Sequence, residues 1–274
     1  MSLRGQAAVD GSQPSVSKIN LIGGIAVSDE SKDYRDNATT EEEKGFKVTI
    51  SENGPYLVSG NLPLKKEIIV SEPNGDSVGW RDGQKYPDRD RYALCRCGKS
   101  RSKPFCDGTH ERAEFDGNEL AAAVPYNKQA AAFDGPELVL TDAQKLCSAA
   151  RFCDPAGGVW QLTRRSGDPE AKKQAIKEAC NCPSGRLVVW DRKTRQAIEP
   201  DFEPAISLIE DPEQQVSGPI WLKGGIPLES SSGICYETRN RATLCRCGGS
   251  GNKPFCDGTH CENGFNDGDE SVRK

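Results

Sequence analysis

One sixteen-residue stretch occurs twice in this 274-residue chain and restricts its fold more than any other feature. Residues 95–110 read CRCGKSRSKPFCDGTH and residues 245–260 read CRCGGSGNKPFCDGTH, so that 13 of 16 positions are identical. Each copy contains three cysteines and one of the only two histidines in the chain. Three thiols and an imidazole at a fixed spacing, present twice, indicate two sites that bind a metal ion or a metal cluster.

The spacing of the donors favours an iron–sulfur cluster over a zinc ion. The first two cysteines of each copy are separated by one residue, whereas zinc sites usually begin with two cysteines separated by two to four residues. The third cysteine and the histidine are four residues apart, which places both on one face where a turn enters a helix. Zinc stays an alternative because it also accepts three cysteines and one histidine. A disulfide between neighbouring cysteines would be strained and would leave the histidines unexplained. The candidate ligands are Cys95, Cys97, Cys106 and His110 in the first copy and Cys245, Cys247, Cys256 and His260 in the second.

A second pair of repeats lies upstream of the first. Residues 54–64 (GPYLVSGNLPL) and 218–228 (GPIWLKGGIPL) share glycine, proline and leucine in register. The two copies are 164 residues apart here and 150 residues apart at the cysteines, so the first copy carries 14 extra residues. We place these extra residues around SEPNGDSVGW (71–80). The alternation in FKVTIS, YLVSG and EIIVS predicts strands, so each repeat is a set of short strands that leads into a motif.

The motifs resemble the CDGSH iron–sulfur domain of the mitoNEET type, with Thr109 and Thr259 where the family name has serine. The resemblance implies one [2Fe-2S] cluster per motif. The first two cysteines would hold an inner iron, and the third cysteine and the histidine an outer, more exposed iron. It also implies a small β-rich cap over a cluster-binding loop and helix, paired with a second copy about a two-fold axis. Since both copies lie in one chain, we expect a monomer with an internal pseudo-dimer.

Two further cysteines near the second motif serve as controls. Cys235 and Cys261 align with Lys85 and Glu111, and neither has a counterpart in the other repeat. We therefore interpret them as packing residues, or as a free thiol in the case of Cys261, and not as ligands.

The other four cysteines lie between the two repeats. LCSAARFCD and ACNCPSGRL flank a predicted helix at 168–180, and a predicted strand follows at 186–191. Over residues 138–192 the pattern resembles half of a single-cluster bacterial ferredoxin, with Ala150 where such proteins usually carry a second ligand. Two interpretations stay open: a third cluster, [3Fe-4S] or [4Fe-4S], or a folded segment without metal. The ligands of a third cluster would be Cys147, Cys153 and Cys182. Cys180, at the end of the helix, is either a fourth thiolate or a packed side chain.

We predict a mainly β fold with small α parts (α+β). Two β-cap CDGSH modules pair about a pseudo-two-fold axis, with a ferredoxin-like segment between them. The predicted divisions are a polar N-terminal arm at 1–45, the first CDGSH module at 46–133, the ferredoxin-like segment at 134–200 and the second CDGSH module at 201–274. The arm is assigned from its many charges and its low apolar content.

The composition excludes several classes of function. A net charge of −5 argues against nucleic-acid binding. No apolar run approaches the roughly 20 residues of a membrane helix, and the N-terminus lacks the pattern of a secretory signal. Twelve cysteines without such a signal predict thiols kept reduced in the cytoplasm. No histidine outside the motifs remains for acid–base chemistry, so we do not expect an enzyme.

Two functions use the same residues, and the sequence does not separate them. One is electron transfer in which reduction is coupled to proton uptake at the histidines. The other is storage or transfer of iron–sulfur clusters, or redox and pH sensing. Both require a redox partner protein or a cluster acceptor. A zinc-stabilised interaction module is the third alternative.

Overall fold

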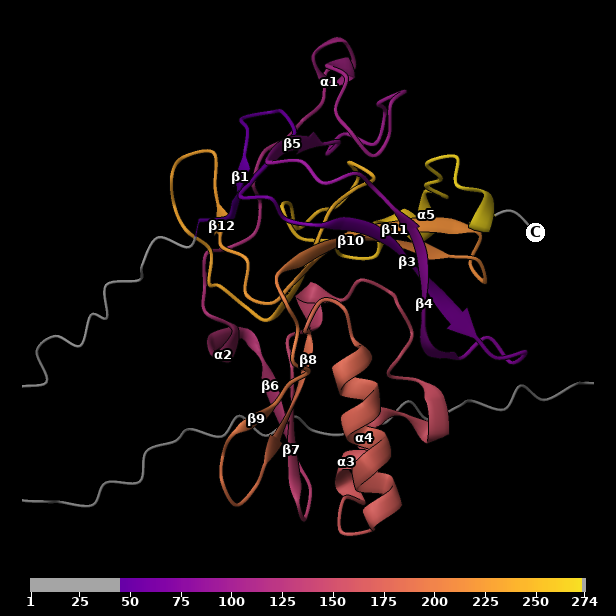
Figure 1. Cartoon of the computed structure of the whole chain (residues 1–274). Coiled ribbons are helices and arrows are strands. Elements are labelled where there is room, and N and C mark those ends of the chain that lie inside the picture. The colour runs from indigo at the N-terminus through magenta and orange to yellow at the C-terminus, as the bar shows by residue number, and fades with distance from the viewer. Residues whose placement is uncertain (1–44, 273–274) are drawn as a thin grey trace, which may run out of the picture. The chain divides into compact units, whose positions relative to one another are not determined.

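The computed structural model describes residues 45–272 (Figure 1), so the predicted arm lies, apart from Gly45, outside the described residues. The strands of the first repeat carry the β-branched and aromatic residues that suit a half-buried sheet. In chain order, the strands of the first repeat are β1 (Lys47–Ile50), β2 (Tyr56–Ser59), β3 (Leu64–Ser71), β4 (Ser77–Lys85) and β5 (Arg91–Leu94). The second repeat supplies β10 (Ala205–Asp211), β11 (Val216–Lys223), β12 (Leu228–Glu229) and β13 (Arg241–Leu244).

These strands form two sheets, and each sheet contains strands of both repeats. One sheet has the order β12-β1-β2-β5 and the other has the order β13-β11-β10-β3-β4. Figure 1 shows the early strands β3 and β4 beside the late strands β10 and β11 in one sheet. The third strand of each repeat, β3 or β12, therefore belongs to the sheet of the other repeat.

The exchanged strands pair in equivalent ways. The β12–β1 pair and the β3–β10 pair are both parallel, and all other pairs in the two sheets are antiparallel. Leu228 lies opposite Val48 in one sheet, and Leu64 lies opposite Ile206 in the other. Leu64 and Leu228 are the aligned last residues of the upstream repeat. Strand β4 has no counterpart in the second repeat, which agrees with the predicted insertion around residues 71–80.

One hydrophobic core joins the two sheets. It contains Val48, Ile50, Tyr56 and Val58 from the first repeat and Ile206, Leu208, Ile220 and Leu244 from the second, all of them nearly inaccessible to solvent. Burial of such side chains contributes about 1.5–3 kcal/mol each. Neither repeat encloses this core alone.

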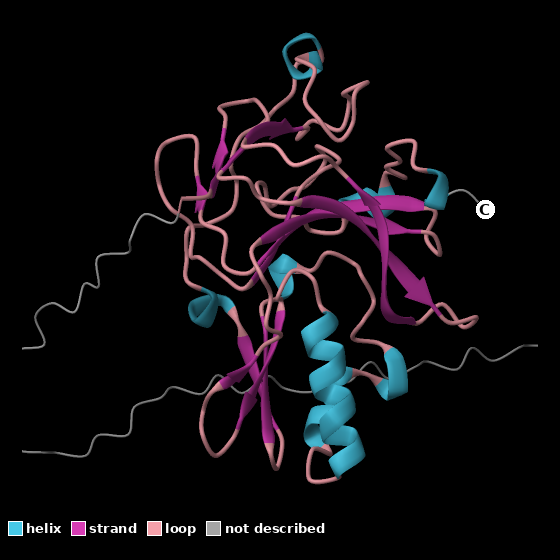
Figure 2. Cartoon of the chain, in the orientation of Figure 1, coloured by secondary structure: helices cyan, strands magenta, loops and turns pink. Residues whose placement is uncertain are grey.

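The segment between the repeats has its own sheet and most of the helical residues (Figure 2). Its sheet has the order β6-β7-β8-β9. The strands are β6 (Ala131–Asp134), β7 (Leu138–Asp142), β8 (Leu187–Asp191) and β9 (Ala197–Ile198). The helices are α2 (Tyr126–Gln129), α3 (Val159–Arg164) and α4 (Pro169–Asn181), with 3-10 turns η1 (Gln144–Leu146) and η2 (Pro155–Gly157).

Helix α4 follows the sequence prediction closely. Asp168 accepts the backbone N–H of Glu170 and Pro169 occupies the first turn, as expected at a helix start. One face of the helix packs on the sheet, with Ala171, Ala175 and Ala179 buried. The segment therefore has a small core of its own.

The predicted mainly β fold with small α parts is confirmed. Residues Glu43–Lys274 form one compact unit, and the predicted boundaries inside it stay predictions. No helix in residues 45–272 has the length and apolar character needed to cross a membrane.

Candidate metal centres

The first motif begins where β5 ends and closes on the short helix α1 (Thr109–Arg112). Two backbone bonds fold the loop back on the strand: Cys95 N–H donates to Pro104 and Cys106 N–H donates to Ala93, at 2.8 and 2.9 Å. This fold brings the four donors into two pairs. The Sγ atoms of Cys95 and Cys97 are 3.7 Å apart, and Cys106 Sγ lies 3.3 Å from Nδ1 of His110.

The second motif repeats this geometry between β13 and the short helix α5 (Thr259–Glu262). The Sγ atoms of Cys245 and Cys247 are 3.9 Å apart, and Cys256 Sγ lies 3.4 Å from Nδ1 of His260. In both motifs the same nitrogen of the histidine therefore faces the third cysteine.

The aspartate of each motif holds the loop rather than simply capping the helix. Asp107 accepts the backbone N–H groups of Arg101 and Thr109, at 2.8 and 3.0 Å. Asp257 accepts those of Gly251 and Thr259 in the same way. Hydrogen bonding by Thr109 and by the backbone N–H of Arg101 holds the pKa of Asp107 well below its usual range. The following glycine has φ of 79° or 92°, a conformation that favours glycine.

Backbone N–H groups also point at the sulfurs. Lys99 donates to Cys97, Gly108 to Cys106 and Gly249 to Cys247, each at 3.4 Å. Hydrogen bonds to sulfur are one of the features that set the potential of an iron–sulfur centre. The donor set and its surroundings thus fit such a cluster.

The four candidate ligands of each motif lie in two pairs. Across residues 45–272, no three histidine, cysteine, aspartate or glutamate side chains converge as ligands of one ion. A tetrahedral zinc site needs four donors around one point, whereas a binuclear cluster takes two donors on each of two irons. All twelve cysteines are free, so the disulfide alternative is not realised.

Each CxC pair favours one thiolate. A hydrogen bond from the Cys97 thiol lowers the pKa of Cys95 to about 6, and a bond from Cys245 lowers that of Cys247 to about 6. Thiolates are the form that binds metal. The same contact, together with burial, raises the pKa of the partner thiol, Cys97 or Cys245, so each pair holds one thiolate at neutral pH.

The two sites differ at their cysteine–histidine end. In the first motif the His110 side chain is 16% exposed and Cys106 is partly exposed. In the second motif His260 and Cys256 are only 4% and 3% exposed. Burial lowers the pKa of His260 to about 4, which keeps the imidazole neutral. The more exposed outer end implied by the family resemblance is thus seen in the first motif, and the second motif departs from it.

The arginine between the first two cysteines is buried in both motifs, a feature that the spacing alone did not single out. Arg246 pairs with Glu210 at 3.0 Å and with Asp267. Arg96 donates to the carbonyl of Gly117 at 2.6 Å and lies over Tyr56, with no carboxylate partner among the described residues. The signal in the sequence was the identical Arg in both copies.

A third candidate centre lies in the middle segment. One cavity is lined by residues 147–153 and by Cys182, Pro183, Arg186 and Leu187. It brings together the three predicted ligands Cys147, Cys153 and Cys182, and Ala150 also faces it. Three cysteines on one cavity are the donor type that an iron–sulfur cluster takes, although their side chains do not converge as ligands of one ion.

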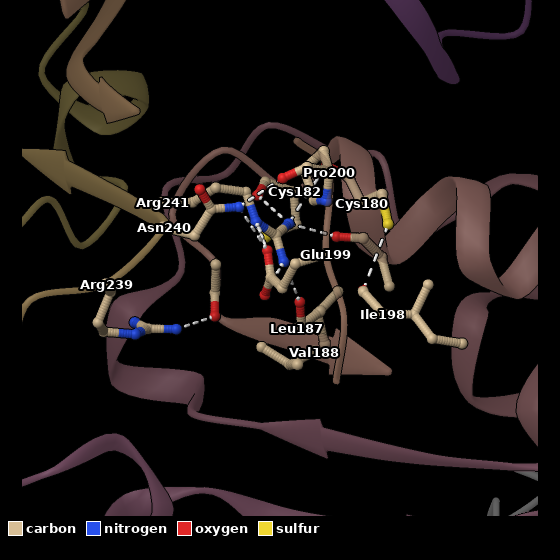
Figure 3. A network of polar contacts seen from close by, with 12 residues as sticks. Cys180, Cys182, Leu187, Val188, Ile198, Glu199, Pro200, Arg239, Asn240 and Arg241 are labelled. Atoms are coloured by element: carbon tan, nitrogen blue, oxygen red, sulfur yellow. Dashed lines mark hydrogen bonds and ion pairs between the residues drawn. The ribbon is translucent and has the colours of Figure 1, made fainter. Parts of the chain in front are cut away.

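Cys180 lies outside this cavity. Its Sγ points to the carbonyl of Ile198 at 3.6 Å (Figure 3). Arg241 of β13 fixes the same region, since its guanidinium donates to the carbonyl of Cys182 at 2.7 Å and pairs with Glu199. The second repeat thereby helps to position a candidate ligand of the middle segment.

Cys235 and Cys261, the two cysteines without a counterpart in the other repeat, differ in their exposure to solvent. Cys261 is partly buried, near Arg151. Cys235 is exposed, so its interpretation as a packing residue is wrong: the chain turns outward there, and only its backbone bridges to Glu229.

Comparison with known protein families gives two matches. Residues 53–111 and 217–261 match the family described as iron-binding zinc finger CDGSH type. Residues 133–192 match the family described as divergent 4Fe-4S mono-cluster. No curated protein matches the chain. The matched ranges contain all eight candidate ligands of the motifs and all three of the middle segment.

Proposed function

The chain carries two CDGSH domains and, between them, a divergent ferredoxin-like segment, and from this premise we propose that it is an electron-transfer protein with one [2Fe-2S] cluster in each motif. The observation that supports this most directly is the division of each donor set into two pairs. Such a cluster supplies one-electron redox chemistry. The protein contributes thiolates, a neutral imidazole and backbone N–H groups directed at sulfur.

The proposal includes an internal pseudo-dimer. The reciprocal exchange of β3 and β12, with equivalent register, supports a pseudo-two-fold relation between the modules. A contact between the two motifs also supports it. A Cβ atom at Gly98 would lie 2.5 Å from the carbonyl oxygen of Cys247, and one at Gly248 would lie 2.5 Å from that of Cys97. The two CxC turns thus touch through glycines that leave no room for a side chain.

A third cluster in the middle segment belongs to the same proposal. It is supported by the cavity that Cys147, Cys153 and Cys182 line together. With three thiols and Ala150 at the fourth position, a [3Fe-4S] cluster suits the site. Cluster storage or transfer to an acceptor protein is the alternative function, favoured by the partly exposed Cys106 and His110.

The metal content tests this proposal. We expect a red-brown protein whose visible band bleaches with dithionite, with about seven iron atoms per chain. Replacing Cys147, Cys153 and Cys182 by serine should leave about four iron atoms, whereas Cys180→Ser should change nothing. Iron and sulfide assays and visible spectra measure both. A colourless protein that binds zinc would contradict the proposal, and four iron atoms in the unaltered chain would remove the third site.

The two histidines should make the redox potential depend on pH. Reduction adds negative charge, so the reduced state binds a proton more tightly and the potential falls as pH rises, by up to about 59 mV per unit. Replacing His110 and His260 by cysteine should remove most of this slope and slow the release of clusters in acid. Redox titrations at several pH values measure the slope. An unchanged slope and unchanged acid release in the double variant would contradict a role of the histidines.

The cluster-free protein should also become less stable as the pH falls. Burial places the pKa of His260 at about 4 in the folded chain, below the roughly 6.5 of an unperturbed histidine. The unfolded chain therefore binds the proton first, and stability is lost as pH falls from about 6.5 towards 4.

A further inference from the structure

The loop of the middle segment at residues 145–151 lies against the second motif, and nothing described lies at the equivalent place on the first. A Cβ atom at Gly258 would be 3.3 Å from Cβ of Ala149 and 3.7 Å from the carbonyl oxygen of Cys147. A Cβ atom at Gly108, the matching residue of the first motif, would meet no atom within 4 Å. Both glycines precede the short helix that carries the histidine.

A side-chain hydrogen bond and an ion pair hold this loop in place. Asn252, in the second motif, donates from Nδ2 to the carbonyl of Lys145 at 3.0 Å. Its counterpart in the first motif is Ser102, which is exposed. At the other end of the loop Arg151 makes a two-point ion pair with Asp211 of β10, at 2.6 and 3.1 Å.

An apolar contact completes the cover. Phe255, next to the ligand Cys256, packs on a cluster that includes Leu146 and Tyr126 of the middle segment. The matching Phe105 packs on the shared core, as Phe255 also does, but it is not part of this cluster. The exposed Arg89 lies over the Phe105 ring, at 4.5 Å from its centre. The middle segment thus covers the cysteine–histidine end of the second motif and not that of the first.

We infer that loop 145–151 is a built-in shield that closes the cysteine–histidine end of the second site, so that exchange of iron with acceptors or chelators takes place at the first site. The end of the second site that stays partly exposed is the CxC end, at Cys247. This inference rests on the proposed function, because it assigns the labile role to one of the two motifs. Groups covered by packed chain are reached only when that chain opens locally, and such opening costs free energy.

The test follows which ligands become free when iron is removed. The cluster-loaded protein is treated with ferrozine at constant pH, samples are quenched with iodoacetamide, and peptide mass spectrometry measures alkylation of Cys106 and Cys256. We expect Cys106 to be freed at least about tenfold faster than Cys256. Arg151→Ala and Asn252→Ser should raise the rate at Cys256 and leave the rate at Cys106 unchanged.

Two matched control variants distinguish the effect of loop 145–151 from a general destabilisation of the protein. Ser102→Ala alters the equivalent position of the first motif, and Arg165→Ala removes an exposed cation elsewhere on the middle segment; neither should change either rate. Arg151 also lines the cavity of the third site. The test therefore depends on Asn252→Ser in the case that Arg151→Ala does not fold. Equal rates at Cys106 and Cys256 in the unaltered protein would overturn the inference, and so would unchanged rates in Asn252→Ser. A protein without iron would instead overturn the proposed function.

Discussion

A fragment that ends at residue 130 should fail to stay a monomer with a bound cluster. Without the second repeat, β1 loses its parallel neighbour β12 and β3 loses β10. The shared core would also lose eight buried side chains: Ile206, Leu208, Ile220, Leu222, Ile226, Leu228, Tyr236 and Leu244. At about 1.5–3 kcal/mol for each large apolar side chain, this loss matches or exceeds the roughly 5–15 kcal/mol by which a domain is stable. We expect the fragment to self-associate by exchanging strands or to lose its cluster.

Light scattering on the eluted fragment and its visible spectrum measure this outcome. The control is a chain of residues 45–274, which keeps every described strand and should be monomeric and coloured. A monomeric, stable and coloured fragment would show that the two repeats fold independently.

Within the full chain, a substitution of Tyr56 weakens the contact between the two repeats without removing either of them. The Tyr56 hydroxyl donates to the carbonyls of Cys245 and Pro254 in the other motif, at 3.0 and 3.1 Å, so Tyr56→Phe should destabilise the protein by about 1–3 kcal/mol.

The two clusters should have different potentials, with the first cluster accepting an electron more readily. Arg96 is buried in the first site without a carboxylate partner among the described residues, whereas Arg246 is paired with Glu210 and Asp267. A buried positive charge favours the more negative reduced state and raises the potential. At roughly 8–10 Å and an effective dielectric constant near 20, one such charge contributes about 2 kcal/mol. For one electron this is about 70–90 mV, from about 59 mV per tenfold change.

Redox titration followed by electron paramagnetic resonance resolves the two waves. Asp267→Asn removes one carboxylate from Arg246 and should raise the potential of the second cluster alone. The comparison is Lys99→Gly with Arg101→Gly, which removes two exposed cations of the first loop. Solvent screens these charges, so we expect only about 10–20 mV per charge from them. Two coincident waves, or split waves that Asp267→Asn leaves unmoved, would contradict the assignment of the difference to the buried arginines.

The sequence by itself determined the pattern of candidate ligands, the duplication and the strand-rich character of the repeats. These follow from local rules: thiols and imidazoles bind metal at restricted spacings, and alternating apolar residues form half-buried strands. The same rules indicated helix α4 and favoured Cys147, Cys153 and Cys182 over Cys180 as candidate ligands. They failed at Cys235, where exposure depends on where a loop runs and not on residue type.

Only the tertiary structure decided how the duplicated parts are combined. The exchange of β3 and β12 depends on pairing between residues more than 140 positions apart, and no local pattern in either strand specifies its partner. No local pattern specifies that Glu210 and Asp267 pair with Arg246, or that loop 145–151 lies against Gly258. Both motifs have nearly the same residues, yet one lies open and the other is covered. The physical reason is that burial and charge pairing are set by what packs against a motif, and the single middle segment can pack against only one of two equivalent surfaces.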